Sequence, residues 1–328
     1  MKRRTVAVVV ACALALGILA FPVCAQGSKT PNYPNHPITL ICPVAAGGGT
    51  DALSRLLASL IKEDLGVPVN VVNRPGGNGV IGHTAIAMSS PDGYTIGMPT
   101  FEITTLHWLG LTELSYKDMV PICIVNADSP AILVSTSGPV QTYEDLLKRI
   151  KANPGKLKAS GTIIGGSWHL GMCGWLMAAG LKTNDVVWVP NSGAAPSLQE
   201  LVAGGVDFVT CSLPEAATLI EAKKVKPLAI MSEVRNPVFP DIPTLKELNV
   251  DWSLAAWRGI AAPKGTSPEI AAVIENAIAK AVQSEAFKKF MKERGFGTVW
   301  KSSKDLETFL PQSDANNGKV IQALGLKK

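Results

Sequence analysis

Three consecutive glycines, Gly47, Gly48 and Gly49, lie between an apolar segment, ITLICPV, and an amphipathic segment, LSRLLASLIK. The apolar segment predicts a buried strand, and the spacing of the leucines predicts a helix. A helix N-terminus carries unpaired N–H groups and about half a positive charge, and glycine lets a ligand approach them closely. The turn therefore predicts an anion-binding site, with a purely structural glycine turn as the alternative. Its candidate residues are Ala45, Ala46, Gly47, Gly48, Gly49, Thr50 and Asp51.

The same pattern recurs at three later junctions between a predicted strand and a predicted helix. KLKAS leads into SGTIIGGSWHL, VVWVP leads into NSGAAPS, and FVTC leads into SLPE, which is a capping box. If these turns meet in one cleft, charge-assisted hydrogen bonds of about 1.5–3 kcal/mol each would hold an organic anion without a buried arginine. The candidate ligand-binding residues here are Ser160, Gly161, Gly165, Gly166, Ser167, Trp168, His169, Ser192, Gly193, Ala194, Cys211 and Ser212.

Two enzyme interpretations compete with anion binding. Ser167 and His169 suggest a hydrolase, but a histidine stands where the G-x-S-x-G motif needs its last glycine. Residues two apart on a helix also do not face each other, so Ser167 is expected to be an N-cap and His169 to pack or to donate a hydrogen bond inward. No catalytic residue is predicted.

The second enzyme interpretation is dinucleotide binding, because Gly47-x-Gly49-x-x-Ala52 satisfies the glycine fingerprint after a predicted strand. The second strand, however, ends in Asn73 and Arg74, without the acid that holds a ribose hydroxyl. The sequence also has neither a phosphate-binding P-loop nor the histidine and cysteine spacings of metal sites. We therefore expect neither a cofactor nor a metal.

Three large side chains near the predicted cleft remain open at this point. Trp168 follows a predicted binding turn and Trp257 lies on a predicted crossing strand, so each is a candidate for the cleft wall. Arg258 either neutralises a ligand carboxylate or is a solvated surface charge, and the sequence favours neither.

The first 25 residues have the layout of a secretory signal, with Lys2, Arg3 and Arg4 before an apolar run and small residues near Ala25. Lipid anchoring through Cys24 is disfavoured by the bulky residues before it. Removing three of 31 basic residues leaves 28 against 26 acidic ones, a net charge of +2 that argues against nucleic acid as a partner. The four remaining cysteines are expected to be buried thiols, with disulfides as the alternative.

Beyond the signal, strand and helix patterns alternate along the whole chain, which predicts an α/β protein with mostly parallel sheets flanked by helices. About 300 residues exceed what one core usually supports. We therefore expect two lobes with a ligand cleft between them. Residues 26–125 together with about 233–328 form the first lobe, whose final helices are free to cross over, and residues 126–232 form the second.

The motifs A-G-G-G-x-D, N-R-P-G-G-x-G, P-D-G-Y and WRGIAAPKGT together resemble the solute-binding proteins of tripartite tricarboxylate transporters, the Bug-type receptors. The resemblance implies a periplasmic, monomeric receptor of the periplasmic-binding-protein fold that closes on a small di-, tri- or aromatic carboxylate. It delivers the acid to membrane permease subunits and performs no chemistry. It also implies that the turn from Ala45 to Asp51 holds one carboxylate through amides and waters, with the later turns contributing from the other lobe. A sensory receptor for a membrane signalling partner is the alternative.

Three departures from the family pattern concern the ligand. Cys211 replaces a common aspartate, which argues against ligands with an amino group, and Trp168 replaces a small or polar residue. Asn191 and Ser192 replace a frequent tyrosine–lysine pair. The resemblance therefore predicts the class of ligand and leaves its identity open.

Overall fold

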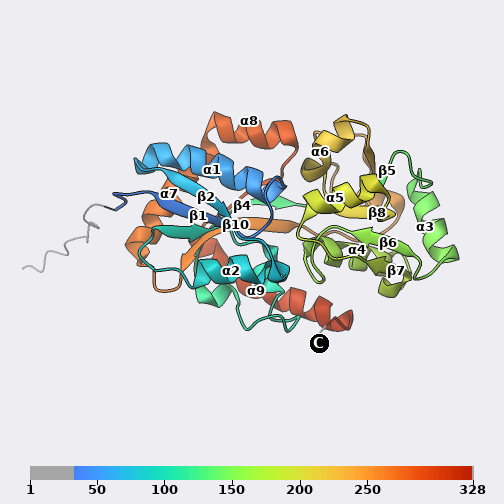
Figure 1. Ribbon diagram of the computed structural model, residues 1–328, viewed down its shortest axis with the longest axis horizontal. Helices are drawn as coiled ribbons and strands as arrows, with labels where there is room; N and C mark the ends of the chain where they lie inside the picture. Colours follow the sequence, from blue (N-terminus) through green and yellow to red (C-terminus); the bar gives the residue numbers. More distant parts are fainter. Residues whose placement is uncertain (1–32, 327–328) are drawn as a thin grey trace, which may run out of the picture.

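The computed structural model describes residues 33–326, and the predicted signal segment lies outside these residues. Within them, two sheets form the centres of two lobes, each flanked by helices (Figure 1). This confirms the predicted two-lobed α/β fold. Both sheets are mixed rather than mostly parallel, because the chain crosses between the lobes and returns in the reverse direction. A buried strand has the same apolar pattern whichever way its neighbours run, so the pattern alone did not indicate this reversal.

The first sheet has the strand order β11-β4-β10-β3-β1-β2. Its strands are β1 (Ile38–Cys42), β2 (Val69–Asn73), β3 (Thr95–Gly97), β4 (Met119–Asp128), β10 (Ala256–Pro263) and β11 (Thr298–Lys301). β1 is parallel to β2 and β3, whereas β10 runs antiparallel to β3 and β4. The flanking helices are α1 (Gly49–Leu65), α2 (Val80–Ala87), α7 (Pro268–Gln283), α8 (Glu285–Arg294) and α9 (Ser303–Ala323). In Figure 1, α1 and α8 lie above this sheet and α2 and α9 lie below it.

The second sheet has the order β7-β6-β8-β5-β9. Its strands are β5 (Pro130–Ser135), β6 (Leu157–Ser160), β7 (Val186–Trp188), β8 (Phe208–Ser212) and β9 (Val225–Ile230). The helices of this lobe are α3 (Tyr143–Ala152), α4 (Ser167–Ala178), α5 (Ala194–Ala203) and α6 (Leu213–Glu221). The 3₁₀ turns of the molecule are η1 (Gly77–Gly79), η2 (Phe101–Thr104), η3 (Tyr116–Asp118), η4 (Thr183–Asp185) and η5 (Lys246–Leu248). The lobe boundary expected at residue 125 falls inside β4, and the chain enters the second sheet at Pro130.

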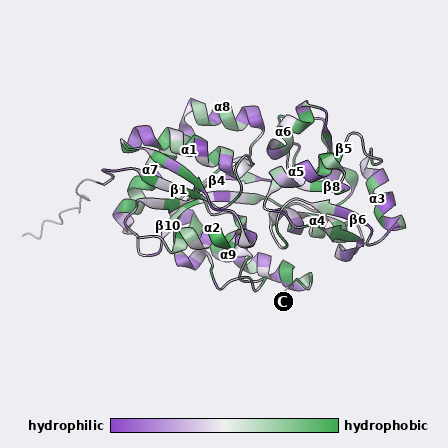
Figure 2. Ribbon diagram, viewed as in Figure 1, coloured by the Kyte–Doolittle hydropathy of each residue, from purple (hydrophilic) through white to green (hydrophobic). Residues whose placement is uncertain are grey.

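Each lobe has its own apolar core, and the strands are largely hydrophobic in Figure 2. Phe287 is fully buried in the first core, and Trp175 packs edge-on against Phe208 in the second, with ring centroids 5.8 Å apart. A third apolar cluster contains residues of both lobes, among them Ile41 and Val209. The lobes are therefore in apolar contact as well as joined by the chain.

Two helix ends follow local rules, since a glycine favours a left-handed C-cap and a serine before Pro-Glu favours an N-cap. Gly66 ends α1 with φ 69°, and the side chain of Ser267 caps α7 by accepting a hydrogen bond from the Ile270 amide. Cys42, Cys123, Cys173 and Cys211 are buried free thiols. No helix within residues 33–326 is both long enough and apolar enough to cross a membrane.

Candidate functional site: a cavity between the lobes

A cavity of about 410 Å³ lies between the two lobes. The first lobe contributes the start of α1, the glycine turn η1 and β10, and the second contributes the starts of α4 and α5. Nine of the residues predicted for the site line this cavity, namely Ala45, Gly48, Gly49, Thr50, Ser167, Trp168, Ser192, Gly193 and Ala194. The structure thus brings the glycine turns of both lobes together.

The N-termini of α1, α4, α5 and α6 all contribute residues to the cavity wall. N–H groups in a first helical turn have no intrahelical acceptor. In the described part of the chain, no backbone acceptor receives the amides of Gly49 and Thr50 in α1, or of Ala194 and Ala195 in α5. These amides, one group in each lobe, are free to bind an anion.

The first turn of α4 already has a carboxylate bound to it. Glu102, on η2 of the first lobe, accepts the Ser167 amide at 3.0 Å and the Ser167 hydroxyl at 2.9 Å through Oε1. Its other oxygen, Oε2, accepts the hydroxyl of Thr100. Ser167 follows Gly166, which is the N-cap of α4, so the expectation that Ser167 is the N-cap is wrong. A glycine N-cap has no side chain to satisfy the helix start, and Glu102 does so from the opposite lobe.

The N-terminus of α6 is also occupied by a side chain of the protein. Ser212 is the N-cap, and its amide donates to Oε2 of Glu215, as the predicted capping box requires. The Ser212 hydroxyl donates to the same oxygen. The other oxygen of Glu215 accepts Nη2 of Arg258 at 3.2 Å. Of the four converging helix starts, α4 and α6 are therefore bound by glutamates, whereas α1 and α5 are not.

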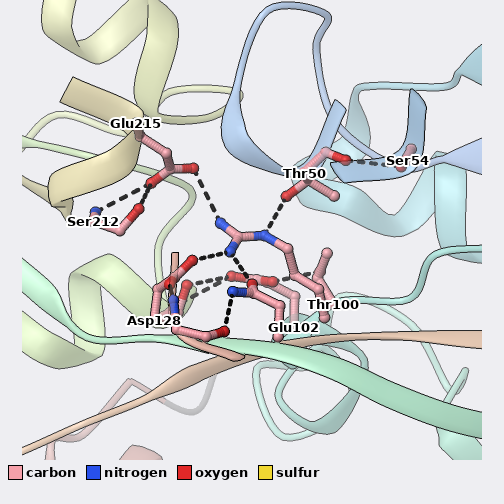
Figure 3. A network of polar contacts seen from close by, with 11 residues as sticks. Thr50, Ser54, Thr100, Glu102, Asp128, Ser212 and Glu215 are labelled. Atoms are coloured by element: carbon pink, nitrogen blue, oxygen red, sulfur yellow. Dashed lines mark hydrogen bonds and ion pairs between the residues drawn. The ribbon is translucent and has the colours of Figure 1, made fainter. Parts of the chain in front are cut away.

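Arg258 on β10 is buried and bonds to Thr50, Asp128 and Glu215, which are labelled in the polar network of Figure 3. Its Nε donates to the Thr50 hydroxyl at 2.8 Å, and Nη1 donates to Asn126 and to Asp128, each at 2.5 Å. Only 4% of the side chain is exposed, so Arg258 is not a solvated surface charge. Its positive charge is balanced by Asp128 and Glu215. The side chain connects β10 to the start of α1 through Thr50 and to α6 through Glu215.

The charges in this network shift one another's pKa values. Burial raises the pKa of Glu215 and the nearby Asp128 adds to this, although Arg258 and the Ser212 hydrogen bonds act in the opposite direction. Burial disfavours the charge of Arg258, but the two carboxylates outweigh it and raise its pKa. The guanidinium therefore stays protonated.

Ten of the predicted site residues lie outside the cavity lining, namely Ala46, Gly47, Asp51, Ser160, Gly161, Gly165, Gly166, His169, Cys211 and Ser212. Asp51 lies outside the cavity lining and accepts hydrogen bonds from the Gly47 amide, Arg55 and Asn73. Burial raises its pKa, but these hydrogen bonds outweigh burial and lower it. It thus stabilises the turn itself. The Asn73 side chain donates to Asp51 and to the Val44 carbonyl, so it belongs to the hydrogen bonds of the turn. It does not take the place of the acid that a dinucleotide site uses to bind ribose.

Several of the others, in the second lobe, serve its packing. The Ser160 hydroxyl bonds to Ser197 and to the Val189 carbonyl, and Cys211 is fully buried. A Cβ at Gly161 would lie 2.2 Å from the Thr210 carbonyl oxygen, so glycine is needed there for close packing of the backbone. Gly161, which was predicted to contact the ligand, therefore has a purely structural role.

The hydrolase alternative requires His169 to hydrogen-bond to Ser167, and within residues 33–326 His169 bonds to other partners instead. Nδ1 of His169 accepts the Gly165 amide at 2.9 Å, and Nε2 lies 3.5 Å from Cys173 Sγ. The ring packs against Trp188, with centroids 4.8 Å apart. His169 therefore packs as expected, but it accepts a hydrogen bond rather than donating one through Nδ1.

His169 has a predicted effect on stability. Burial lowers its pKa from the usual 6.5 to about 4. Between these values the unfolded chain binds a proton that the folded chain does not. The free energy of unfolding therefore decreases as the pH is lowered, by about 3 kcal/mol from pH 7 to pH 4. Urea unfolding at pH 7 and pH 4 should show that His169→Gln loses about this much of the pH dependence. An unchanged dependence would contradict the prediction.

Aromatic side chains contribute to the apolar part of the wall. Phe101, Trp168 and Trp257 all line the cavity, and Trp168 and Trp257 were both candidates from the sequence. The sequence interpretation missed Glu102 and treated Glu215 only as a cap. An acid three residues after a predicted strand, as in YTIGMPTFE, was the signal available for Glu102. No cluster of potential metal ligands occurs in residues 33–326.

Comparison with known proteins matches most of the chain to one family. The family model described as "Tripartite tricarboxylate transporter family receptor" matches residues 53–326. Protein BugT of Bordetella pertussis is 31% identical over 315 residues, covering 94% of each chain. A TctC solute-binding protein from Polaromonas, solved without ligand, is 33% identical with a TM-score of 0.65, over 89% of this chain and 99% of that one. An R. palustris protein solved with adipate is 28% identical with a TM-score of 0.83, over 89% and 98%.

Proposed function

Because the chain belongs to the tripartite tricarboxylate transporter receptor family, we propose that it captures a small organic carboxylate in the cavity between its lobes and delivers it to membrane permease subunits. The observation that supports this most directly is the pair of unbound helix N-termini, α1 and α5, on opposite sides of one cavity. The R. palustris relative solved with adipate supports an acid ligand.

Capture follows from the placement of these amides. One carboxylate of the ligand accepts hydrogen bonds from the Gly49 and Thr50 amides at the start of α1. Arg258 fixes the Thr50 side chain by donating a hydrogen bond to its hydroxyl. The other end of the ligand reaches the Ala194 and Ala195 amides in the second lobe. Each charge-assisted hydrogen bond contributes about 1.5–3 kcal/mol, and because the amides belong to different lobes, the ligand stabilises the closed form.

A thermal-shift screen tests this function directly. The panel contains benzoate, pentanedioate, hexanedioate and citrate, with the uncharged pentanediamide as the matched control. An acid at 100 times its Kd is expected to stabilise the protein by about 2.7 kcal/mol, whereas the diamide leaves the melting temperature unchanged. The proposal fails if no acid in a broad panel raises the melting temperature.

Export and partner form the finer part of the proposal. Residues 1–25 direct export to the periplasm and are removed near Ala25, which N-terminal sequencing of the exported protein would test. Two affinity-capture experiments, one with the permease subunits and one with a sensor-kinase ectodomain, would distinguish uptake from sensing. We expect ligand-dependent capture by the permease.

A further inference from the structure

Glu102 satisfies a helix N-terminus that would otherwise be an anion-binding site of the cavity. The α4 start offers the Ser167 amide and hydroxyl, and its N-cap, Gly166, has no side chain to satisfy them. Glu102 and Ser167 both line the cavity, so their contact forms part of its wall. The bond also joins the two lobes, because η2 follows β3 of the first sheet and α4 follows β6 of the second.

The carboxylate of Glu102 is held firmly from its own side. Thr100 donates its hydroxyl to Glu102, and its amide donates to Nε2 of the buried His83 at 3.2 Å. The Glu102 carbonyl accepts the Thr105 amide and hydroxyl, at 2.8 and 3.0 Å. The side chain therefore projects from a turn with its own hydrogen bonds.

The other acid in the wall is balanced differently. Glu215 pairs with Arg258, so its charge is compensated by a cation. Within residues 33–326, Glu102 forms no ion pair: its carboxylate hydrogen-bonds to Thr100 and Ser167, and Arg258 acts on it only through space. A carboxylate approaching α4 would therefore meet a negative charge at a site that is already filled.

Resting on the proposed carboxylate-binding function, we propose that Glu102 is a specificity determinant that limits the ligand to acids with at most two carboxylates. One carboxylate binds at α1 and a second at α5, and the α4 position, which would receive a third, is closed by Glu102. The receptor consequently rejects tricarboxylates, although its family is named for them.

The test uses two matched pairs of acids that differ by one carboxylate. These pairs are pentanedioate with propane-1,2,3-tricarboxylate, and benzene-1,3-dicarboxylate with benzene-1,3,5-tricarboxylate. Isothermal titration is carried out on the parent, Glu102→Ala and Glu102→Gln. Alanine empties the α4 position, whereas glutamine removes the charge but leaves an acceptor oxygen there.

The parent is expected to bind the diacid of at least one pair at least tenfold more tightly than its triacid. Glu102→Ala should raise triacid affinity relative to diacid affinity by about tenfold or more, because one hydrogen bond to a charged group is worth that factor. Glu102→Gln should give a smaller gain. Loss of the bond between the lobes weakens both acids alike, so the ratio isolates specificity.

Ser167→Ala is the control, because it removes one donor to Glu102 and keeps the negative charge, so the triacid should still be rejected. Circular dichroism and melting temperature verify the fold, and the isosteric Glu102→Gln covers the case in which Glu102→Ala does not fold. Equal affinity of the parent for the diacid and the triacid in every pair that it binds overturns the inference. An unchanged triacid-to-diacid ratio in the Glu102 variants also overturns it. Failure of the proposed function is distinct, since then the parent binds no acid at all.

Discussion

Gly48→Val is expected to abolish acid binding, with a loss of at least about 100-fold in affinity, while the protein remains folded. Gly48 lines the cavity and is the N-cap of α1, and a Cβ built there meets no atom within 4 Å. Its backbone is extended, with φ −86° and ψ 176°, which valine adopts readily. The branched side chain would therefore occupy the space of the carboxylate. The cost to stability should be about 1 kcal/mol, because valine is a poor N-cap.

Isothermal titration with the acid found in the screen measures this loss, and circular dichroism checks the fold. Ala46→Val is the matched control, because Ala46 is exposed in the same turn and lies outside the cavity lining. It should bind as the parent does. Gly49 is less suitable, since a Cβ there would lie 2.9 Å from the Glu215 side chain and disturb the fold itself. Unchanged affinity in Gly48→Val would place the ligand elsewhere.

Arg258→Met is expected to lower the free energy of unfolding by about 3–5 kcal/mol at pH 7. The methionine fills much of the same volume but leaves Asp128 and Glu215 buried without a cation. It also removes the hydrogen bond to Thr50, so the start of α1 loses its anchor and acid binding should weaken too. Urea unfolding of parent and variant gives the difference in stability.

Two further variants show whether the loss comes from uncompensated charge. Adding Asp128→Asn and Glu215→Gln to Arg258→Met should recover part of the stability, because neutral partners need no cation. Arg235→Met is the surface control: Arg235 pairs with Glu247 where both side chains are about half exposed, and it should change stability little. If Arg258→Met were no less stable than Arg235→Met, the network would not be the structural element that we infer.

Local sequence signals predicted where the helices begin and how some of them are capped. The glycine turn before α1, the capping box at Ser212 and the cap at Ser267 were all readable, because each involves residues within four positions of one another. The motifs of the family predicted the two-lobed fold and the class of ligand. Helix starts from both lobes do line one cavity, as the turns suggested.

The roles of the charged residues were not predictable in the same way. The sequence interpretation expected an anion site without a buried arginine, whereas Arg258 is buried in the wall of the cavity and bonds to Thr50, which is 208 positions away. Similarly, Glu102 reaches Ser167 across 65 positions and between lobes. No local periodicity or spacing encodes such a pair.

The sequence by itself thus determined the helix starts with their free amides, since capping and glycine geometry are local. The glutamate at α6 belongs to a local capping box that the sequence shows. Only the tertiary structure decided that the α4 amide is occupied as well, because Glu102 reaches it through a contact made when the chain is folded. The physical reason is that a carboxylate binds an amide only within hydrogen-bond distance. For Glu102 that distance is set by the packing of one lobe against the other.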